Sequence, residues 1–363
     1  MQPLALEALS VRKLRSLGSV DLTFSPKFNV LSGDNGQGKT NLLEAVYLLA
    51  TSRSFRATKL TELVAFGSEV ASVRGVLREG EETRAQSLGL QGGIRIARID
   101  GKRPRSLLAY AVKSPVVVFH PGEVELSMGP SAERRKLLDR VALYLAPSTL
   151  ADLEAYGRCI RERQRALDTR GPGAKDLEDW EAVAASHGLR VMEGRALAAS
   201  RLAVEAEIAF ERIGAPGLTL KVGYAPSAPR DEASFRRALA EARPRDLRRG
   251  AATVGPHRDE LRLELAGHVA RGTASQGQHR SLVLALKSAE IEVVAAARGT
   301  RPILLLDDVS SELDASRTGA LFAFLREHRG QVLLTTTRPE LIAIGGAEER
   351  KDFHVLGGTI VPL

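Results

Sequence analysis

The sequence predicts an α/β protein in which a mixed sheet with helices is assembled from both ends of the chain, with a helical arm inserted between the two halves. Three observations in the 363 residues lead to this prediction. A glycine-rich loop at residues 33–40 follows a short apolar strand. A second apolar strand, at residues 302–306, ends in two carboxylates. The stretch between these motifs has helical periodicity and is far longer than one βαβ unit requires.

The N-terminal half of this head, residues 1–130, is predicted to consist of strands around one helix. Apolar runs and period-two alternation predict the strands. Apolar residues at helical spacing follow Thr40 and predict a helix there. The expected strands are residues 4–11, 19–24, 28–31, 71–77, 94–99 and 116–119.

The middle of the chain, residues 131–250, is predicted to be the helical arm. Helical periodicity runs from Ser131 to about residue 213 and is broken once, by turn residues at 169–173, which indicates a helical hairpin. A strand at 218–224 and an arginine-rich helix at 232–249 follow. The first arm helix has arginines that predict a solvated face or, alternatively, a DNA-contacting one: Arg158, Arg161, Arg163 and Arg165.

The C-terminal half of the head, residues 251–363, is predicted to return to sheet structure. A strand at 260–265 precedes a helix at 278–297, and the apolar strand at 302–306 comes next. We expect residues 331–335 to form the last buried strand.

The formal net charge of +8 and a pI near 9.8 favour a polyanionic partner such as nucleic acid. An arginine-rich composition that reflects codon usage explains the same numbers, since only 11 of the 52 basic residues are lysine. The charge by itself leaves these two explanations open.

Cysteine content and apolar runs predict a cytoplasmic protein without a membrane span. Cys159 is the single cysteine, so no intrachain disulfide and no cysteine-based zinc site can form. The N-terminus has charges at Glu7 and Lys13 and lacks the apolar block of a signal peptide. No run of 18 apolar residues occurs.

The glycine-rich loop matches the G-x-x-x-x-G-K-[ST] phosphate-binding pattern at every position. Its glycines let backbone N–H groups point inward at phosphate oxygens, and the following helix adds its positive dipole end. We expect Lys39 to reach the β- and γ-phosphates and Thr40 to place its hydroxyl on Mg²⁺. The predicted nucleotide-binding residues are Gly33, Asp34, Asn35, Gly36, Gln37, Gly38, Lys39 and Thr40.

The two carboxylates after residues 302–306 lie where open α/β sheets place ligands, at the carboxyl end of a strand. Asp307 is suited to hold Mg²⁺, directly or through water. Asp308 is then better placed to orient or deprotonate an attacking water. Alternatively, the segment is a core strand followed by a helix that Asp308 caps.

A third motif, Ser275-Gln276-Gly277-Gln278, precedes the helix predicted at 278–297. Ser275 is placed to cap this helix, and exposed N–H groups there favour an anion. A capped helix without further function is the alternative.

Six blocks along the chain resemble the RecF family, in order and at compatible spacing. They begin with Gly33–Asn41 and end with the acidic motif and Glu312-Leu313-Asp314. The blocks between them are 53–56, 129–135 with Leu138-Asp139, 255–259 and 275–280. At His279 we expect glutamine, so the local contact of that residue differs from the family pattern.

The resemblance implies an ABC/Rad50-like head with a short arm that binds ATP and Mg²⁺ and forms a dimer around the nucleotide. Ser275–Gln278 is similar to the signature loop of such ATPases, and Asp314 occupies the D-loop position; both act on the ATP of the other subunit. Thr335–Thr337 ends a strand where many relatives have a histidine that senses the γ-phosphate. The family is expected to bind gapped or junction DNA, to act with RecR and RecO in loading RecA, and to leave DNA through weak, DNA-stimulated ATP hydrolysis.

Basic residues outside the motifs are candidates for DNA contact. They are also explained as ordinary solvated side chains. The low aromatic content, 4%, favours contact with the backbone of duplex or junction DNA over base stacking. His257 and Arg258 either lie near nucleotide or DNA, or form a buried turn with an Arg–Asp pair. The candidate DNA-contacting residues are Arg56, Lys59, Arg236, Arg237, Arg248 and Arg249.

Three other functions compete with a DNA-repair ATPase. A transporter-type ABC subunit lacks the inserted arm and the basic charge. An SMC- or Rad50-type tether needs longer coiled coils than the roughly 80 residues after Ser131 supply at ~1.5 Å per residue. A nucleotide-gated scaffold would not depend on Asp308 for its function.

Overall fold

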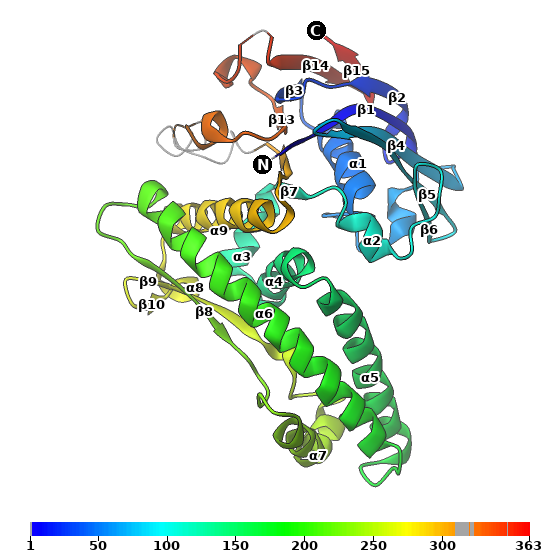
Figure 1. The fold of residues 1–363 in the computed structure, drawn as a ribbon, viewed down its shortest axis with the longest axis vertical. Helices are drawn as coiled ribbons and strands as arrows, with labels where there is room; N and C mark the ends of the chain where they lie inside the picture. Colours follow the sequence, from blue (N-terminus) through cyan, green and yellow to red (C-terminus); the bar gives the residue numbers. More distant parts are fainter. Residues whose placement is uncertain (1, 309–318, 320–322, 347) are drawn as a thin grey trace. The chain divides into compact units, whose positions relative to one another are not determined.

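The computed structural model describes residues 2–308, 319, 323–346 and 348–363. The chain forms two compact units, and α9 (Gln276–Arg298) begins in the second of them and ends in the first. The first unit contains residues 1–123 and 294–363, and the second contains residues 124–293. Figure 1 shows the helices and strands of both units.

The first unit contains a sheet built mainly from the start of the chain, in which neighbouring strands are antiparallel except for β1 and β11. Its strands follow the order β11-β1-β4-β5-β6, with β2 paired to β1. Alternate residues of β4 are buried, as the period-two pattern predicts. The strands are β1 (Gln2–Leu14), β2 (Leu17–Thr23), β4 (Val70–Glu79), β5 (Glu82–Gln91), β6 (Ile94–Ile99) and β11 (Thr300–Arg301).

A second sheet of the same unit is almost entirely parallel. Its order is β15-β14-β3-β13-β12-β7, and only β15 is antiparallel to its neighbour. The strands are β3 (Phe28–Ser32), β7 (Val116–Phe119), β12 (Ile303–Leu306), β13 (Val332–Thr336), β14 (Arg350–Leu356) and β15 (Thr359–Pro362). All residues of β3, β7, β12 and β13 are buried, and none of them is charged; β7 and β12 are wholly apolar, as expected of strands covered on both faces.

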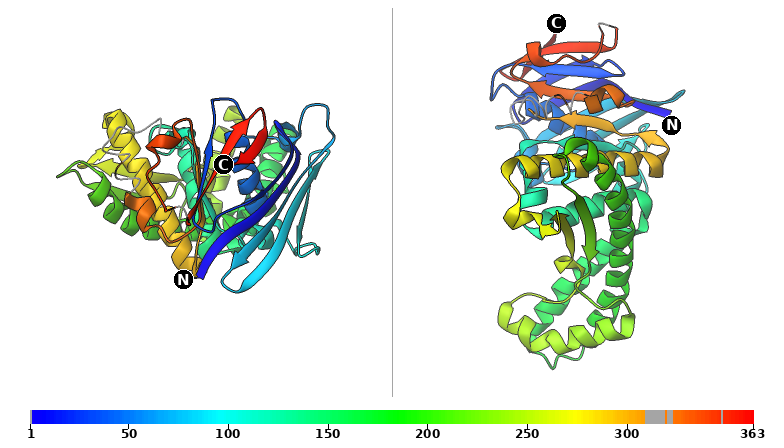
Figure 2. Two further views of the ribbon diagram at one scale, coloured as in Figure 1. Left: turned by 90° about the horizontal axis from the view of Figure 1, so that it is seen from above. Right: turned by 90° about the vertical axis from the view of Figure 1, so that its left-hand side faces the viewer.

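Helix α1 (Lys39–Thr51) packs against strands of both sheets, and one apolar core contains residues of the helix and of each sheet. Figures 1 and 2 show it between the two layers. A buried glutamine, Gln331, joins the layers through hydrogen bonds: its Nε2 donates to the carbonyls of Leu6 and Ser25, and its Oε1 accepts from the Leu6 N–H. Short helices complete the unit: α2 (Leu107–Ala111), η1 (Leu60–Leu63), η2 (Pro121–Val124) and η4 (Pro339–Leu341).

The second unit combines long helices with the three-stranded antiparallel sheet β10-β9-β8. α5 (Ser148–Arg170) and α6 (Leu177–Ile213) form the predicted helical hairpin, and α7 (Glu232–Arg249) packs against both (Figure 2). The remaining elements are α3 (Glu125–Met128), α4 (Ser131–Leu145), α8 (Ala270–Thr273), η3 (Pro256–Arg258), β8 (Leu220–Ala225), β9 (Glu260–Leu265) and β10 (His268–Val269).

The two units divide the chain at other positions than the three segments expected from the sequence. Residues 251–293, expected in the C-terminal half of the head, belong to the second unit. The physical reason is strand pairing, because β9 is hydrogen-bonded along its length to β8 of the arm segment.

Two expectations about secondary structure and burial are wrong. Residues 331–335 are not the last buried strand, because β14 follows and pairs with β3, with Phe353 and Val355 buried. Arg163 does not belong to a solvated face: it is completely buried, while Arg158, Arg161 and Arg165 are exposed.

Arg163 is the centre of an ionic network that joins the three arm helices. Its guanidinium donates to Glu181 of α6 at 3.0 Å, and to Asp246 and the Leu239 carbonyl of α7 at 2.7 and 2.6 Å. Arg243 is a second partner of Glu181, at 2.6 Å. Every group around the buried charge is therefore paired, which is the condition for burying it without a large cost.

We predict that Arg163→Met destabilises the second unit, because it leaves Glu181 and Asp246 buried with one partner fewer. Removing one member of a buried ionic network costs about 3 kcal/mol or more. Urea unfolding followed by circular dichroism measures the loss. Arg165→Met on the same helix is the matched control and should change stability by less than about 0.5 kcal/mol. Equal stabilities of the two variants would refute the network's role.

Candidate phosphate-binding site

Three segments that are far apart in the sequence meet at one edge of the parallel sheet. The phosphate-binding loop, Gly33–Thr40, follows β3; Thr335 lies near the end of β13; Asp307 and Asp308 follow β12. β13 lies between β3 and β12, and all three strands are parallel. Because the carboxyl ends of parallel strands meet at the same edge, the loop and the acidic pair are brought together.

The loop has the backbone conformation that its glycines allow. Gly33, Gly36 and Gly38 all have positive φ, at 147°, 80° and 110°, values that side-chain-bearing residues rarely adopt. α1 starts at Lys39, directly after Gly38. The unpaired N–H groups of the first helical turn and the positive end of the helix dipole are therefore available to an anion at this place.

Lys39 is buried and contacts the loop that precedes it. Its Nζ donates to the carbonyl oxygens of Gly33 and Asp34 at 2.5 and 2.8 Å. Burial lowers the pKa of Lys39 from its ordinary value, while the negative charges of Asp308, Asp307 and Asp34 act in the opposite direction. The ammonium group thus lies among the loop carbonyls, close enough to acidic groups to be influenced by them.

Asp307 joins the loop to the neighbouring strand through one carboxylate oxygen. Its Oδ1 accepts from the Thr40 hydroxyl at 2.8 Å and from the Thr335 hydroxyl at 2.9 Å. The Asp307 N–H donates to the Phe119 carbonyl of β7 at 2.8 Å, which fixes the backbone. A threonine hydroxyl beside a carboxylate is the donor set that Mg²⁺ takes in phosphate-binding sites, so these residues fit the ion that the fold family implies.

Asp308 has a left-handed backbone conformation, with φ 49°, and its N–H donates to Thr335 Oγ1 at 2.9 Å. Aspartate tolerates this conformation better than most residues. Thr335 therefore orients both acidic residues. The role expected for a threonine in place of the missing histidine, contact with the γ-phosphate, stays a prediction; the Thr335 hydroxyl is already engaged with Asp307 and Asp308.

Ser275 forms a capping box with Gln278 at the start of α9. The Gln278 N–H donates to Ser275 Oγ at 3.3 Å, and the Ser275 N–H donates to Gln278 Oε1 at 2.7 Å. This confirms the expected helix cap. Ser275 and Gln276 are exposed, whereas Gly277 and Gln278 are half-buried; all four belong to the second unit.

His279, where we expected glutamine, is buried, and its Nδ1 lies 2.5 Å from the Ser127 hydroxyl, so it has a packing role. Burial lowers the pKa of this imidazole. Asp314, expected in the D-loop position, lies outside the described residues.

The six candidate DNA-contacting residues are all exposed: Arg56, Lys59, Arg236, Arg237, Arg248 and Arg249. Arg56 is the one with a link to the phosphate-binding loop, because its Nη1 donates to Oδ1 of Asn41, the residue after Thr40, at 3.2 Å. The last four lie on α7.

The 255–259 segment matches in part the buried turn with an arginine–aspartate pair, one of the two arrangements considered from the sequence. His257 is half-buried and its Nδ1 lies 2.6 Å from the Tyr156 hydroxyl. Burial lowers the pKa of His257. The Asp259 carboxylate is buried and pairs with Arg195 at 3.1 Å. The arginine–aspartate pair at this turn is therefore formed by Arg195, while Arg258 is exposed, and nearness of His257 or Arg258 to nucleotide or DNA stays a prediction.

Sequence reasoning missed two features of the site. The dual role of Thr335 could not be found, because it depends on which strand lies beside β12. The hairpin turn Gly357-Gly358, which contacts the phosphate-binding loop, was detectable: a Gly-Gly pair between two strand-like runs is a hairpin pattern.

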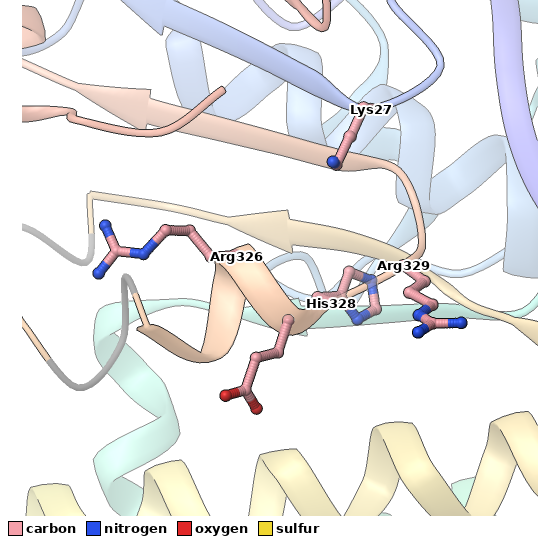
Figure 3. A pocket seen from close by; sticks show the side chains of 5 residues that line it. Lys27, Arg326, His328 and Arg329 are labelled. Atoms are coloured by element: carbon pink, nitrogen blue, oxygen red, sulfur yellow. The ribbon is translucent and has the colours of Figure 1, made fainter. Parts of the chain in front are cut away.

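A hollow in the first unit, of about 520 Å³, lies away from the phosphate-binding edge. Its lining residues are Lys27, Arg326, Glu327, His328 and Arg329 (Figure 3). Lys27 immediately precedes β3, and His328 and Arg329 precede β13. These are the amino ends of the strands, so the hollow is at the opposite end from the loop.

No cluster of three or more histidine, cysteine, aspartate or glutamate residues in the described ranges could hold a metal ion. Among the helices of the described part of the chain, none is long and apolar enough to cross a membrane.

Comparison with known proteins gives matches over the whole chain. The family model described as RecF/RecN/SMC N terminal domain matches residues 5–350. DNA replication and repair protein RecF of Anaeromyxobacter sp. (strain Fw109-5) is 40% identical over 99% of both chains. RecF of Myxococcus xanthus (strain DK1622) is 40% identical over 98% of this chain and 96% of its own.

Solved structures agree with these relatives. The recombination mediator protein RecF of the RecFOR pathway, in its ATP complex, is 28% identical, with a TM-score of 0.88 over 100% of both chains. The Smc head domain of Pyrococcus furiosus, at 16% identity and a TM-score of 0.57 over 99% of this chain and 96% of its own, shows the fold alone. The ABC/Rad50-like head with a helical insertion is thus confirmed. The chain belongs to the RecF family of DNA replication and repair proteins.

Proposed function

We propose that this protein is an ATP-dependent DNA-binding protein of recombinational repair and replication restart, which forms a dimer around ATP at gapped or junction DNA. The observation that carries the proposal is the Asp307 carboxylate, whose Oδ1 accepts from both Thr40 and Thr335. This contact joins the phosphate-binding loop to the acidic pair, as nucleotide hydrolysis requires. A relative of 28% identity has been solved with ATP, which supports the choice of nucleotide.

ATP would lie with its phosphates against the N–H groups of the loop and of the first turn of α1. Lys39 would exchange its carbonyl contacts for the β- and γ-phosphates. Thr40 and Asp307 would hold Mg²⁺, which would neutralise part of the phosphate charge when bound. Asp308 would orient or deprotonate the attacking water, with its backbone fixed by Thr335. We propose that this hydrolysis is weak and stimulated by DNA.

The capping-box loop Ser275–Gln278 would act on the ATP of a second copy of the chain, together with Asp314. The start of this long helix supplies first-turn N–H groups and a positive dipole end suited to a γ-phosphate. Because ATP would then be part of the interface, its binding energy would drive assembly, and hydrolysis would release the dimer.

DNA contact is proposed for the exposed basic residues Arg56, Lys59, Arg236, Arg237, Arg248 and Arg249. The net charge of +8 supports a polyanionic partner. Four of the six lie on α7, whose Asp246 is fixed by Arg163, so their guanidinium groups are carried on a firmly packed helix. RecR is the proposed protein partner in the cytoplasm, with RecO and RecA acting downstream.

We propose that residues 1–130 and 251–363 supply the two halves of the ATPase head and that residues 131–250 form the arm.

We predict that Lys39→Ala weakens ATP binding at least about tenfold, since a charge-assisted hydrogen bond contributes about 1.5–3 kcal/mol. Isothermal titration calorimetry with Mg-ATP measures the dissociation constant. Lys102→Ala removes an exposed lysine of the same unit and should leave the constant unchanged. Equal affinities of both variants and wild type would mean that ATP does not bind at this loop.

We predict that Asp308→Asn binds ATP but hydrolyses it about 10²–10⁴-fold more slowly, the usual contribution of a general base. The variant should therefore accumulate as a dimer in Mg-ATP, and more so with gapped duplex DNA. Sedimentation velocity measures the shift, which Ser275→Arg added to Asp308→Asn should abolish. ATP binding without any dimer would contradict the clamp and leave a monomeric nucleotide switch.

We predict that the double change Arg248→Ala/Arg249→Ala weakens DNA binding and lowers the slope of log K against log salt concentration by about two, one unit for each lost phosphate contact. Fluorescence anisotropy at several salt concentrations gives the slope. Lys102→Ala, the exposed lysine already used as a control, is not among the candidate DNA contacts and should leave the slope unchanged. If the double variant kept the wild-type slope, α7 would not contact DNA.

A further inference from the structure

A β-hairpin close to the end of the chain packs directly against the phosphate-binding loop. β14 pairs in parallel with β3, so that Phe353 lies beside Leu31 and His354 beside Ser32. β15 returns antiparallel to β14. Since β3 ends at Ser32 and β14 continues to Leu356, the hairpin extends beyond β3 along the first residues of the loop.

The turn of this hairpin consists of two glycines that both donate to Gln37. Leu356 pairs with Thr359, which leaves Gly357 and Gly358 as a two-residue connection. Their φ values are 55° and 79°, and positive values at both positions define the tightest common hairpin turn. The Gly357 N–H donates to Gln37 Oε1 at 2.7 Å, and the Gly358 N–H donates to the Gln37 carbonyl at 2.9 Å.

Backbone spacing at this contact excludes side chains at two glycines. A Cβ on Gly33 would overlap the carbonyl oxygen of Val355, and a Cβ on Gly358 would overlap that of Ser16. A Cβ on Gly357, in contrast, would have no heavy atom within 4 Å. The hairpin therefore fits closely between the phosphate-binding loop and the turn that contains Ser16.

We propose that the turn Gly357-Gly358 is a positioning element of the nucleotide site, which holds Gln37 and thereby keeps the loop in its phosphate-binding shape before ATP arrives. The idea rests on the proposed function, because it concerns the same ATP site. A loop with three glycines has many accessible conformations, and ordering it only on binding would cost affinity. The hairpin provides this order when the chain folds. Gln37 is then a positioning residue, whose side chain is directed at the turn.

Two glycine variants test the proposal within one turn. Gly358→Ala and Gly357→Ala impose a similar cost for a left-handed backbone, but only Gly358→Ala adds a methyl group where Ser16 leaves no space. We expect Gly358→Ala to raise the dissociation constant of Mg-ATP about tenfold, a loss of about 1.4 kcal/mol, because the loop must then be ordered on binding. Gly357→Ala should bind within about twofold of wild type, a difference of roughly 0.4 kcal/mol.

Gln37→Ala tests the same contact without adding any atom to the turn, so it remains informative if Gly358→Ala does not fold. It removes the acceptor for the Gly357 N–H and should also weaken ATP binding, with an unchanged midpoint of urea unfolding. Hydrogen exchange of the amides of residues 33–40, measured by mass spectrometry without nucleotide, should become faster in Gln37→Ala and Gly358→Ala and stay unchanged in Gly357→Ala.

The outcomes separate the two proposals. If wild-type protein binds ATP and Gln37→Ala binds it equally well with unchanged loop exchange, the positioning role is refuted. Faster exchange confined to residues 33–40, with weaker ATP binding, supports it. The exchange measurement needs no nucleotide, so it decides by itself whether the turn orders the loop. If wild-type protein bound no ATP, that result would count against the proposed function and not against the positioning role.

Discussion

One carboxylate oxygen, Asp307 Oδ1, holds the phosphate-binding edge together. It accepts hydrogen bonds from the hydroxyl of Thr40, at the start of α1, and from the hydroxyl of Thr335, in β13. The same Thr335 hydroxyl accepts from the Asp308 N–H, so the orientation of the second carboxylate depends on the first. A shift of Asp307 would affect the loop, the neighbouring strand and Asp308 together. The buried β12, between β13 and β7, prevents such a shift by pairing on both sides.

The sequence predicted much of the fold because its patterns are local. α7 and β9 were predicted to the residue, since each has a clear start and stop or strict alternation. β14 was missed because Arg350, Lys351 and Asp352 give it a polar beginning, although Phe353 and Val355 face the core. Arg163 was misjudged because its partners lie on two other helices, so its burial has no local pattern.

The acidic pair and the phosphate-binding loop could be predicted as one site, whereas the contacts that order them could not. The phosphate-binding loop and the two carboxylates can be recognised by their residue types and spacing alone. The contacts of Thr335 with Asp307 and Asp308 follow only once β13 is known to lie between β3 and β12. Residues that act directly on the phosphates can be recognised in a sequence by their type and spacing. Residues that position them are recognised only when the order of the strands is known, and this order results from tertiary packing.

The place of β3 in its sheet has a consequence for synthesis. Its two neighbours are β13 and β14, which begin at Val332 and Arg350. During synthesis, β3 therefore cannot pair with either neighbour until about 300 further residues have been added. At the usual rates of translation, this interval is on the order of tens of seconds. Meanwhile β1, β2, β4, β5 and β6 can pair among themselves, because they are antiparallel and close in sequence. A nascent chain thus contains all of residues 33–40 long before β13 and β14 have been made and can pair with β3.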